Sequence, residues 1–546
     1  MDNDDVKLIQ EIHADHTRMK NDRLLFEDQW NDVAERVWPG HPGFNKGKPQ
    51  PGAKRTERMF DSTPPLALRH FSAAMDSMVT PRTQEWHYLK PQNEALVESQ
   101  AVVRYLEQVT KVLFTMRYRW RANFQSQMGE IWRSCGAFGN GGLMVEDVPG
   151  EGSRYRHIPI RRLLFSEGAD GLVDKAHVDW TLTARQAARR FGEANLPQSI
   201  RNVLQRDPEA QFDFIHVVRP REEWDPRKRD AANMPFASYW LSSSNERIIQ
   251  RSGFRTFPFA IGRFYGGADE TYGRSPAMDG LPDIKQVNEM EKTTIRGAQK
   301  AVDPPLLLQE DGALEAFDLR SGALNYGGLD DQGRELAKPF LTGQQIPLGV
   351  ELTNQKREVI NLAFYVTLFQ ILVDSPQMTA TEVLQRAQEK GVLLGPPLGR
   401  MQSEMLGPMI DRELDIAAQS GLLPEMPEEL VEAGGQVDVE YDSPLNRAMR
   451  AGEGASVLRW VEASAPFVQA DPRAARVINA PRAVRKLAEV FSVPSDYVNS
   501  EDEVDAAMQA DEQAAQAQTL LAAAPVAAGA AKDLAQAQAT AQAARI

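Results

Sequence analysis

The stretch TYGRSPAMDGLPDIKQVNEMEK, Thr271–Lys292, decides how the fold of this chain is interpreted. It contains glycines, an arginine, a serine and several acidic residues, which is the composition of a ligand-binding loop. It also leads directly into the pattern of a long polar helix. Ser275 is a favourable helix N-cap and Pro276 a favourable first helical residue, and Gly273 allows a sharp turn before them. Taken alone, the stretch is either a ligand loop or a hinge.

Pro282 lies inside the helical pattern that follows. Its ring would clash with the carbonyl of Met278 and it has no N–H to donate, so we expect a kink or a restart of the helix there. The pattern continues to residue 302, and the prolines at 304 and 305 end it. A second long helix is predicted over 350–373. The helix over 276–302 is polar nearly all round, so it must pack against neighbours or bridge domains.

The part of the chain before this stretch predicts helices followed by strands. Apolar residues recur at helical spacing in four segments. These are 5–37, a segment that DSTPP at 61–65 opens and residues 80–81 end, 99–116 and 124–138. Ser62 or Thr63 can cap the second of these helices. β-branched and aromatic residues then predict strands at 143–148, 154–159, 172–183, 211–219, 236–242, 246–251 and 256–264, with a short helix over 184–191. The fold class is therefore α+β and predominantly helical, with a β-rich region over 139–266.

The part of the chain after residue 373 predicts more helix. Thr379 and Glu382 have the spacing of a capping box at the start of a helix that runs to about residue 390, and another helix covers 398–419. From about residue 504 the sequence is dominated by Ala and Gln. That composition favours helix but offers no strong apolar stripe, so the segment needs other copies or chains to pack against.

The overall charge argues against binding nucleic acid through bulk electrostatics. The 546 residues include 62 Lys and Arg against 76 Asp and Glu, which gives a net charge of -14 and a pI of about 5.3. Non-specific nucleic-acid affinity comes from basic side chains that displace counterions. The one basic cluster, RYRWR at 117–121, is interpreted as the exposed face of a helix in preference to a nucleic-acid contact. The single cysteine, Cys135, lies in an apolar helical pattern and is interpreted as a buried small hydrophobe.

No arrangement typical of catalysis stands out. His13 and His16 are three residues apart on a charged helix, where a solvated face is a better interpretation than a metal site. Gly47 and Lys48 do not fit the spacing of a phosphate-binding loop, and a nucleophile elbow and a dinucleotide fingerprint are both missing. We therefore predict no catalytic, cofactor-binding or metal-binding residues. No cofactor is expected, and neither a signal peptide nor a membrane-spanning helix is predicted.

Several motifs together resemble a known family. They are FDSTPPLALR at 60–69, MVTPR at 78–82, EWHYL at 85–89, YGRSPAMD at 272–279, KAVDPP at 300–305, TATEV at 379–383, LGPPLGR at 394–400, EMLGP at 404–408 and VEYDSPL at 439–445. Their order and spacing resemble the portal, or head-to-tail connecting, proteins of short-tailed bacteriophages of the podovirus type. The last hundred residues match this family only in character.

The resemblance implies a division of the chain into the parts of a portal subunit. These parts are a wing over 1–275, a first stem helix over 276–302, a clip over 303–349, a second stem helix over 350–373, a tunnel loop over 374–378, spine helices of the wing and crown over 379–445, and a crown over 446–546 with a helical barrel at its end. The tunnel loop, which would face the channel, consists of Asp374, Ser375, Pro376, Gln377 and Met378. Gly273, Ser275, Pro276 and Pro282 would then form the joint between wing and stem.

The resemblance also implies an assembly and its partners. The expected assembly is a ring, usually of twelve copies, at one vertex of the capsid of the virion, built in the host cytoplasm. Expected partners are the major capsid protein, the terminase packaging motor, tail adaptor proteins and double-stranded DNA that passes without sequence specificity; no membrane is involved. An acidic channel would repel DNA, so few Lys or Arg should face it. The competing hypotheses are a metal-dependent hydrolase or nuclease of the packaging apparatus and a monomeric binding scaffold.

Overall fold

The computed structural model describes residues 3–44, 56–97, 99–228, 230–243, 247–302, 306–308, 337–339, 346–373 and 392–447, besides isolated positions and short pieces up to residue 513. The chain divides into two compact units. The first comprises Met1–Lys90, Leu106–Glu425 and Val437–Met449, and the second comprises Pro91–Tyr105, Met426–Gln436 and Arg450–Ile546.

The N-terminal part forms the four helices that the periodicity predicts. They are α1 (Asn3–Arg36), α2 (Thr63–Val79), α3 (Gln100–Arg117) and α4 (Phe124–Phe138). One detail of the prediction is wrong, because neither Ser62 nor Thr63 caps α2 with its side chain. The Asp61 carboxylate accepts the hydrogen bond from the Thr63 backbone N–H at 2.7 Å instead.

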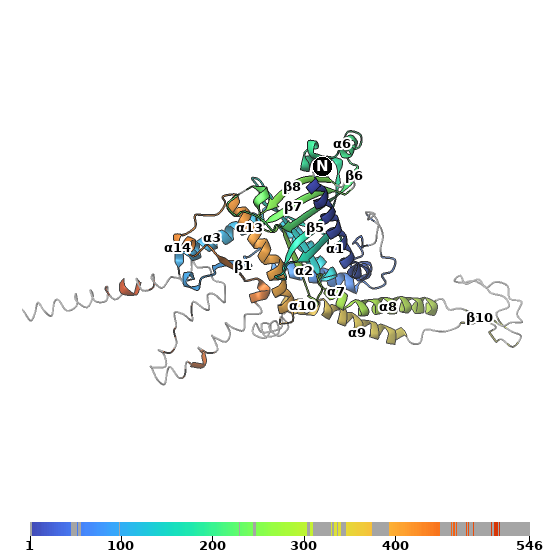
Figure 1. Cartoon of the computed structure of the whole chain (residues 1–546). Helices are drawn as coiled ribbons and strands as arrows, with labels where there is room; N and C mark the ends of the chain where they lie inside the picture. The colour runs from blue at the N-terminus through green and yellow to red at the C-terminus, as the bar shows by residue number, and fades with distance from the viewer. Residues whose placement is uncertain are drawn as a thin grey trace, which may run out of the picture. The chain divides into compact units, whose positions relative to one another are not determined.

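The β-rich region forms two antiparallel sheets. The larger one has the strand order β4-β5-β6-β7-β8, with β4 (Leu163–Glu167), β5 (Val173–Thr183), β6 (Gln211–Pro220), β7 (Phe236–Ser242) and β8 (Arg247–Phe254). The helix α1 lies beside this sheet (Figure 1). Its Ile9 and Ile12 pack on Ile215, Val217 and Leu241 of the sheet. The helices α5 (Ala184–Phe191) and α6 (Gln198–Leu204) follow β5.

The smaller sheet has the order β3-β2-β9, with β2 (Asn140–Val148), β3 (Gly152–His157) and β9 (Phe259–Arg263). The strand β2 pairs with β3 along its C-terminal part and with β9 along its N-terminal part, where Asn140 lies opposite Arg263. The helix α4 runs directly into β2 and packs against α2. Its cysteine, Cys135, is fully buried, as the sequence predicts, and burial raises the pKa of its thiol.

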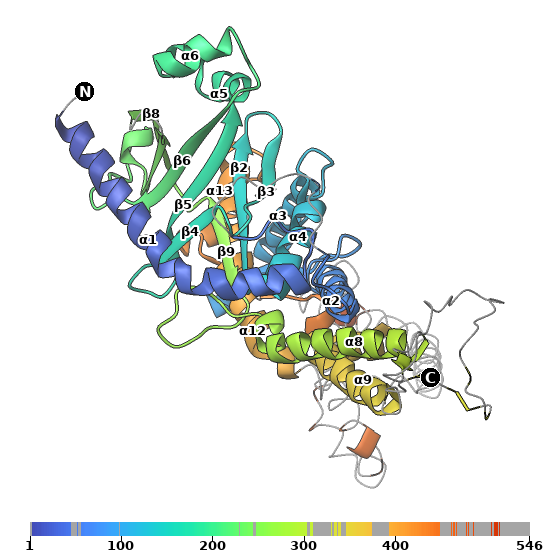
Figure 2. The ribbon, with the colours of Figure 1, turned by 90° about the vertical axis from the view of Figure 1, so that its right-hand side faces the viewer.

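Two long helices lie side by side after this region; the first has the predicted ends at 276 and 302, and the second begins earlier than predicted (Figure 2). The first is divided into α7 (Pro276–Asp279) and α8 (Leu281–Val302). The second begins at Ile346 rather than at residue 350 and is divided into α9 (Ile346–Ala363) and α10 (Val366–Val373). Between them along the chain, β10 (Leu306–Leu308) pairs with β11 (Ala337–Pro339).

The C-terminal described part adds one bent helix and a small sheet. The helix predicted over 398–419 begins at residue 395 and comprises α12 (Gly395–Met401), the π-helical turn η5 (Gln402–Leu406) and α13 (Gly407–Gln419). The strand β12 (Val437–Tyr441) pairs with β1 (His87–Pro91); neither strand was predicted, and nor was β4.

The described part of the second unit includes two pieces, 91–105 without residue 98 and 426–436. They contain α14 (Glu428–Glu432), the single turn of 3-10 helix at Glu94–Leu96 and the start of α3. The Ser99 hydroxyl donates to the Glu429 carboxylate at 2.5 Å, and the Gln92 N–H donates to the Gln436 carbonyl at 3.2 Å. The two pieces are therefore held together by both side-chain and backbone hydrogen bonds.

Two interpretations of charged residues are wrong. Arg117 is not on an exposed helix face but is fully buried, because it pairs with Glu413. His16 is not solvated either, because its ring stacks on His177 with centroids 5.5 Å apart. Both errors arise from partners more than 150 residues away in the sequence.

Several predicted segments lie outside the described residues. These are the tunnel loop at 374–378, the helix expected over 379–390, most of the clip at 303–349 and most of the chain after residue 447. Within the described helices, none is long and apolar enough to cross a membrane.

Candidate functional site

The joint is the segment between β9 and α8, and its N-cap is confirmed. The Ser275 hydroxyl oxygen accepts a hydrogen bond from the Met278 N–H at 3.0 Å and donates one to the Ala137 carbonyl at 2.8 Å. Ser275 is fully buried, and Pro276 occupies the first turn of α7. The cap therefore starts the helix and also ties it to the last turn of α4.

Two glycines allow the backbone of the joint to cross the α4–β2 connection at close range. A Cβ on Gly139, whose φ is +76°, would lie 2.4 Å from the Gly273 carbonyl oxygen, and a Cβ on Gly273 would lie 2.6 Å from the Gly139 oxygen. Gly273 does not have positive φ, so the reason for glycine at this position is the close approach and not the sharp turn that we predicted.

Asn140 fixes this crossing through its side-chain amide. Its Nδ2 donates to the Phe138 and Gly273 carbonyls at 2.8 and 3.2 Å, and its Oδ1 accepts from the Gly273 N–H at 2.8 Å. The side chain thereby satisfies both backbone groups of Gly273 in a buried place, where an unpaired amide would be costly. The sequence feature that indicates this crossing is an Asn between two glycines, and it was not used in the prediction.

The expected restart of the helix at Pro282 is confirmed. The helix is interrupted at Gly280 and begins again at Leu281, which places Pro282 in the first turn of α8. Because Pro282 has no N–H, it cannot donate to the Met278 carbonyl. The Gly280 N–H donates to the Met278 and Pro276 carbonyls instead.

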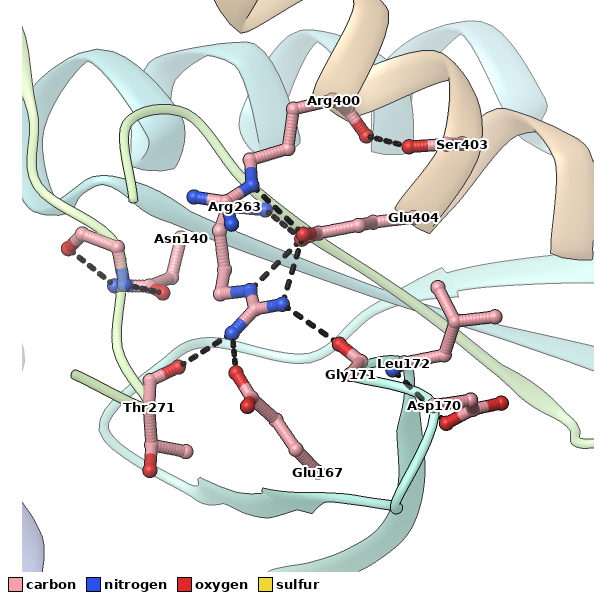
Figure 3. Close-up of polar contacts among 11 residues, drawn as sticks. Asn140, Glu167, Asp170, Gly171, Leu172, Arg263, Thr271, Arg400, Ser403 and Glu404 are labelled. Carbon is pink, nitrogen blue, oxygen red and sulfur yellow. Dashed lines mark hydrogen bonds and ion pairs between the residues drawn. The ribbon is translucent and has the colours of Figure 1, made fainter. Parts of the chain in front are cut away.

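A buried arginine at the end of β9 organises the surroundings of the joint (Figure 3). The Arg263 guanidinium donates to both Glu404 oxygens at 2.8 Å, to the Thr271 carbonyl at 3.3 Å and to the Gly171 carbonyl at 3.2 Å. It also forms an ion pair with Glu167. Arg263 therefore connects the five-stranded sheet, the joint and the η5 turn, and its planar set of donors is what permits this.

Glu404 reaches Arg263 from the π-helical turn η5. Single π turns inside α-helices are frequent at functional positions because they change the direction of one side chain. Glu404 also accepts from Arg400 Nε at 2.8 Å, so its carboxylate is shared by two arginines. Arg400 and Glu404 both lie in motifs of the sequence, but no role was predicted for either.

The break between α9 and α10 lies against the same joint. Tyr365 has a φ of +58°, an uncommon conformation for a bulky residue, and its hydroxyl forms a hydrogen bond with the Tyr265 hydroxyl. The Tyr265 backbone in turn pairs with Arg274 at 2.9 and 3.1 Å. The break between α9 and α10 is thus held by the segment Tyr265–Arg274, which leads into the first long helix.

Ion pairs fix the two long helices to each other and to their base. Lys356 of α9 pairs with Asp283 of α8 at 2.7 Å, and Arg357 of α9 lies 3.3 Å from Glu291 of α8. Arg357 also donates to the Asp61 carboxylate at 2.6 and 2.8 Å, and Asp61 is buried at the start of α2. The carboxylate of Asp61 therefore serves both as the acceptor for the first turn of α2 and as an anchor for α9.

In the joint, Arg263 pairs with Glu404 and Arg274 pairs with Glu270. The described residues hold no group of three or more His, Cys, Asp or Glu side chains that suits a metal ion. What the geometry provides is a rigid connection from two sheets to a pair of projecting helices. Residues 9–498 match the family of bacteriophage head to tail connecting proteins.

The chain belongs to this family. The prediction of a phage portal, or head-to-tail connecting, protein is therefore confirmed, and the alternative of a hydrolase or nuclease is not supported.

The connector is similar to portal proteins of two phages. It is 28% identical to the probable portal protein of Bordetella phage BPP-1 over 451 residues, which cover 81% of this chain and 80% of that protein. It is 25% identical to the portal protein of Salmonella phage epsilon15 over 529 residues, which cover 95% and 94%.

Solved structures that resemble the connector come from gene transfer agent particles. One is from the virion of the native particle, with a TM-score of 0.38 and 14% identity over 77% of this chain and 92% of that one. Another is the neck of the empty particle computed with C6 symmetry, with a TM-score of 0.36 and 14% identity over the same shares.

Proposed function

We propose that copies of this chain form a ring at one vertex of a phage capsid, and that DNA enters and leaves the capsid through the channel of the ring. The observation that carries this proposal is the family match over residues 9–498. The role is structural: the ring connects head and tail and catalyses no reaction. Its location is the virion, with assembly in the host cytoplasm.

We assign the parts of the subunit as the family resemblance implies. Residues 1–275 form the wing, residues 276–302 and 350–373 form the two stem helices, and residues 303–349 form the clip. Residues 374–378 form the tunnel loop, and residues 446–546 form the crown. This assignment is supported by the joint, because Gly273, Ser275, Pro276 and Pro282 lie where two sheets are connected to a projecting pair of helices.

The proposed partners follow from the position of the ring. The wing faces the major capsid protein, the clip receives the terminase motor during packaging and the tail adaptors afterwards, and double-stranded DNA passes without sequence specificity. The number of copies is twelve. Electron microscopy of the purified chain in negative stain tests the assembly: particles with a central hole support it, and small particles of monomer size contradict it.

The charge of the chain supports a channel that does not hold DNA. A net charge of -14 repels phosphate, and each basic side chain that neutralises a phosphate would add affinity. We therefore expect that replacing several channel-facing acids by Lys slows packaging in a motor assay. An unchanged rate in several such variants would contradict the proposed role of the charge.

A further inference from the structure

The turn between α3 and α4 presents an exposed tryptophan between two arginines. Trp120 is 84% exposed, which is unusual for so large an apolar side chain, and Arg119 and Arg121 beside it are exposed as well. Trp and Arg are the residues most enriched at the energetic centres of protein interfaces. Arg121 pairs with Glu151 at 2.7 Å, whereas Arg119 has no ion-pair partner among the described residues.

Hydrogen bonds hold the backbone of this turn, and the Arg121 guanidinium lies over the Trp120 ring, 4.9 Å from its centroid. The Ala122 N–H donates to the Arg119 carbonyl at 3.0 Å, which closes the turn, and the Tyr155 N–H of β3 donates to the Ala122 carbonyl at 2.9 Å. The Tyr118 hydroxyl, just before the turn, lies within hydrogen-bonding distance of the Thr80 and Pro81 carbonyls. A side chain on such a turn loses little conformational entropy when it binds.

A cleft lies between α1 and the edge of the five-stranded sheet. Its volume is about 480 Å³, its lining is mostly polar, and the nearly buried side chains of Met19, Phe165 and Tyr272 lie at its base, with the last two rings 4.6 Å apart. Pockets of this size hold ligands much larger than an indole ring. The cleft is therefore large enough for one tryptophan side chain and the residues beside it.

The rim of this cleft carries two carboxylates that form no ion pair with a described residue. They are those of Asp22 and Asp174. The basic residues of the rim, Arg18 and Lys175, share the single Asp15 carboxylate at 2.5 and 2.9 Å. Together with Asp15, Asp22 and Asp174 they leave one net negative charge, which is opposite in sign to Arg119 beside Trp120.

One chain cannot join these two surfaces itself, because both are fixed to opposite ends of β2. The turn is held beside β3 near the β2–β3 hairpin, through Tyr155 and Glu151. The cleft is at the other end, where Arg263 lies opposite Asn140 and contacts Glu167. The rise per residue of a strand separates these ends by on the order of 20 Å.

We propose that Trp120 of one copy inserts into the cleft of the next copy, with Arg119 facing Asp22 and Asp174. Different surfaces then meet at each contact, which is the type of contact that closes into rings or continues as a filament. This inference rests on the proposed ring and names the residues that hold neighbouring wings together.

Cross-linking through paired cysteines tests the contact. The full chain carrying Arg121→Cys, beside Trp120, and Ser166→Cys, in the lining of the cleft, keeps every residue of the proposed contact. It is assembled and treated with a short bis-maleimide, and we expect a ladder of covalent oligomers on a denaturing gel. The native Cys135 does not interfere because it is buried. The matched control carries Trp224→Cys with Ser166→Cys, since Trp224 is also exposed but lies on another loop, and it should run as a monomer on the gel.

A charge exchange provides the second measurement. Because like charges across an interface are repelled, Arg119→Asp should raise the concentration needed for assembly about tenfold, and adding Asp22→Arg should restore it. Rings from the wild-type chain with no ladder from the cysteine pair would overturn the inference and leave the proposed function intact. A ladder from filaments would support the contact but contradict the closed ring, and a wild-type chain that stays monomeric would overturn both.

Discussion

Arg117 and Glu413 form an ion pair from which solvent is completely excluded, although 296 residues separate them in the sequence. The guanidinium donates to the two carboxylate oxygens at 3.1 and 2.5 Å, and the Tyr155 hydroxyl donates to the same carboxylate at 2.5 Å. Burial alone would lower the pKa of Arg117, but Glu413 raises it, so the arginine stays charged. The pair connects the end of α3 to α13.

Removing one charge of this pair should destabilise the protein strongly. Glu413→Gln leaves the Arg117 charge buried without a counter-charge, which costs about 3–5 kcal/mol. The free energy of unfolding in urea measures the loss. The control is Glu209→Gln in the exposed pair Arg185–Glu209, which should change stability by less than about 1 kcal/mol. Equal losses in the two variants would contradict the role given to burial.

Gly139 should tolerate alanine less well than another glycine of the same conformation. Gly139 and Gly150 have φ of +76° and +79°, so alanine at either costs about 1–2 kcal/mol of backbone strain. Only at Gly139 would the new methyl group also collide with the backbone of the joint; nothing lies within 4 Å of a Cβ on Gly150. Thermal unfolding should show a larger loss for Gly139→Ala, and a smaller one would show that the joint yields easily.

Arg263→Lys should loosen the joint even though the charge is kept. A single ammonium group cannot reach Glu404, Glu167 and the Thr271 carbonyl together, so buried acceptors lose partners, at a cost of about 3 kcal/mol. Hydrogen exchange of peptides from residues 265–275 should become faster. Arg185→Lys, at an exposed position, serves as the control, and unchanged exchange in Arg263→Lys would argue against its organising role.

His157 should make stability depend on pH in the mildly acidic range. Burial lowers the pKa of its imidazole to about 4, so the folded form stays neutral while the unfolded form takes up a proton below about pH 6.5. The unfolded state then binds more protons, and stability falls as the pH is lowered from 6.5 to 4.

Replacing His157 by Phe should remove this contribution. The slope of the unfolding free energy against pH between 6.5 and 4 should fall by up to about 1.4 kcal/mol per pH unit, which corresponds to one proton. Urea unfolding at a series of pH values measures the slope. Identical slopes for the variant and the wild type would show that His157 is protonated in the folded protein.

The sequence predicts well what is determined by local pattern. The helix α5, for example, has the predicted bounds, and Thr183 and Gln186 form a capping box at its N-terminus. It does not predict what depends on distant partners. The break at Tyr365 lies within a continuous apolar run and is held by Tyr265, which is 100 residues away.

The candidate site divides in the same way. Ser275, Pro276 and Pro282 act through the helix that they begin, so their local roles were visible in the sequence. Arg263 and Glu404 have a role only because β9 and η5 come together in the fold. In the sequence, a buried charged residue of this kind cannot be distinguished from a charged surface residue until the residue that pairs with it is known.

The base of the paired helices is fixed by residues of this chain that do not belong to the segment between Val302 and Ile346. Four hydrogen-bonded contacts attach the base. They are Ser275 to the Ala137 carbonyl, Asn140 to the Gly273 carbonyl, the Tyr265 hydroxyl to the Tyr365 hydroxyl, and Arg357 of α9 to the Asp61 carboxylate. The distance between the two helices at their base is therefore independent of what joins their far ends. A foreign domain inserted between Val302 and Ile346 would thus be attached at both of its ends to helices whose spacing is already fixed, which makes this fold a scaffold for engineering.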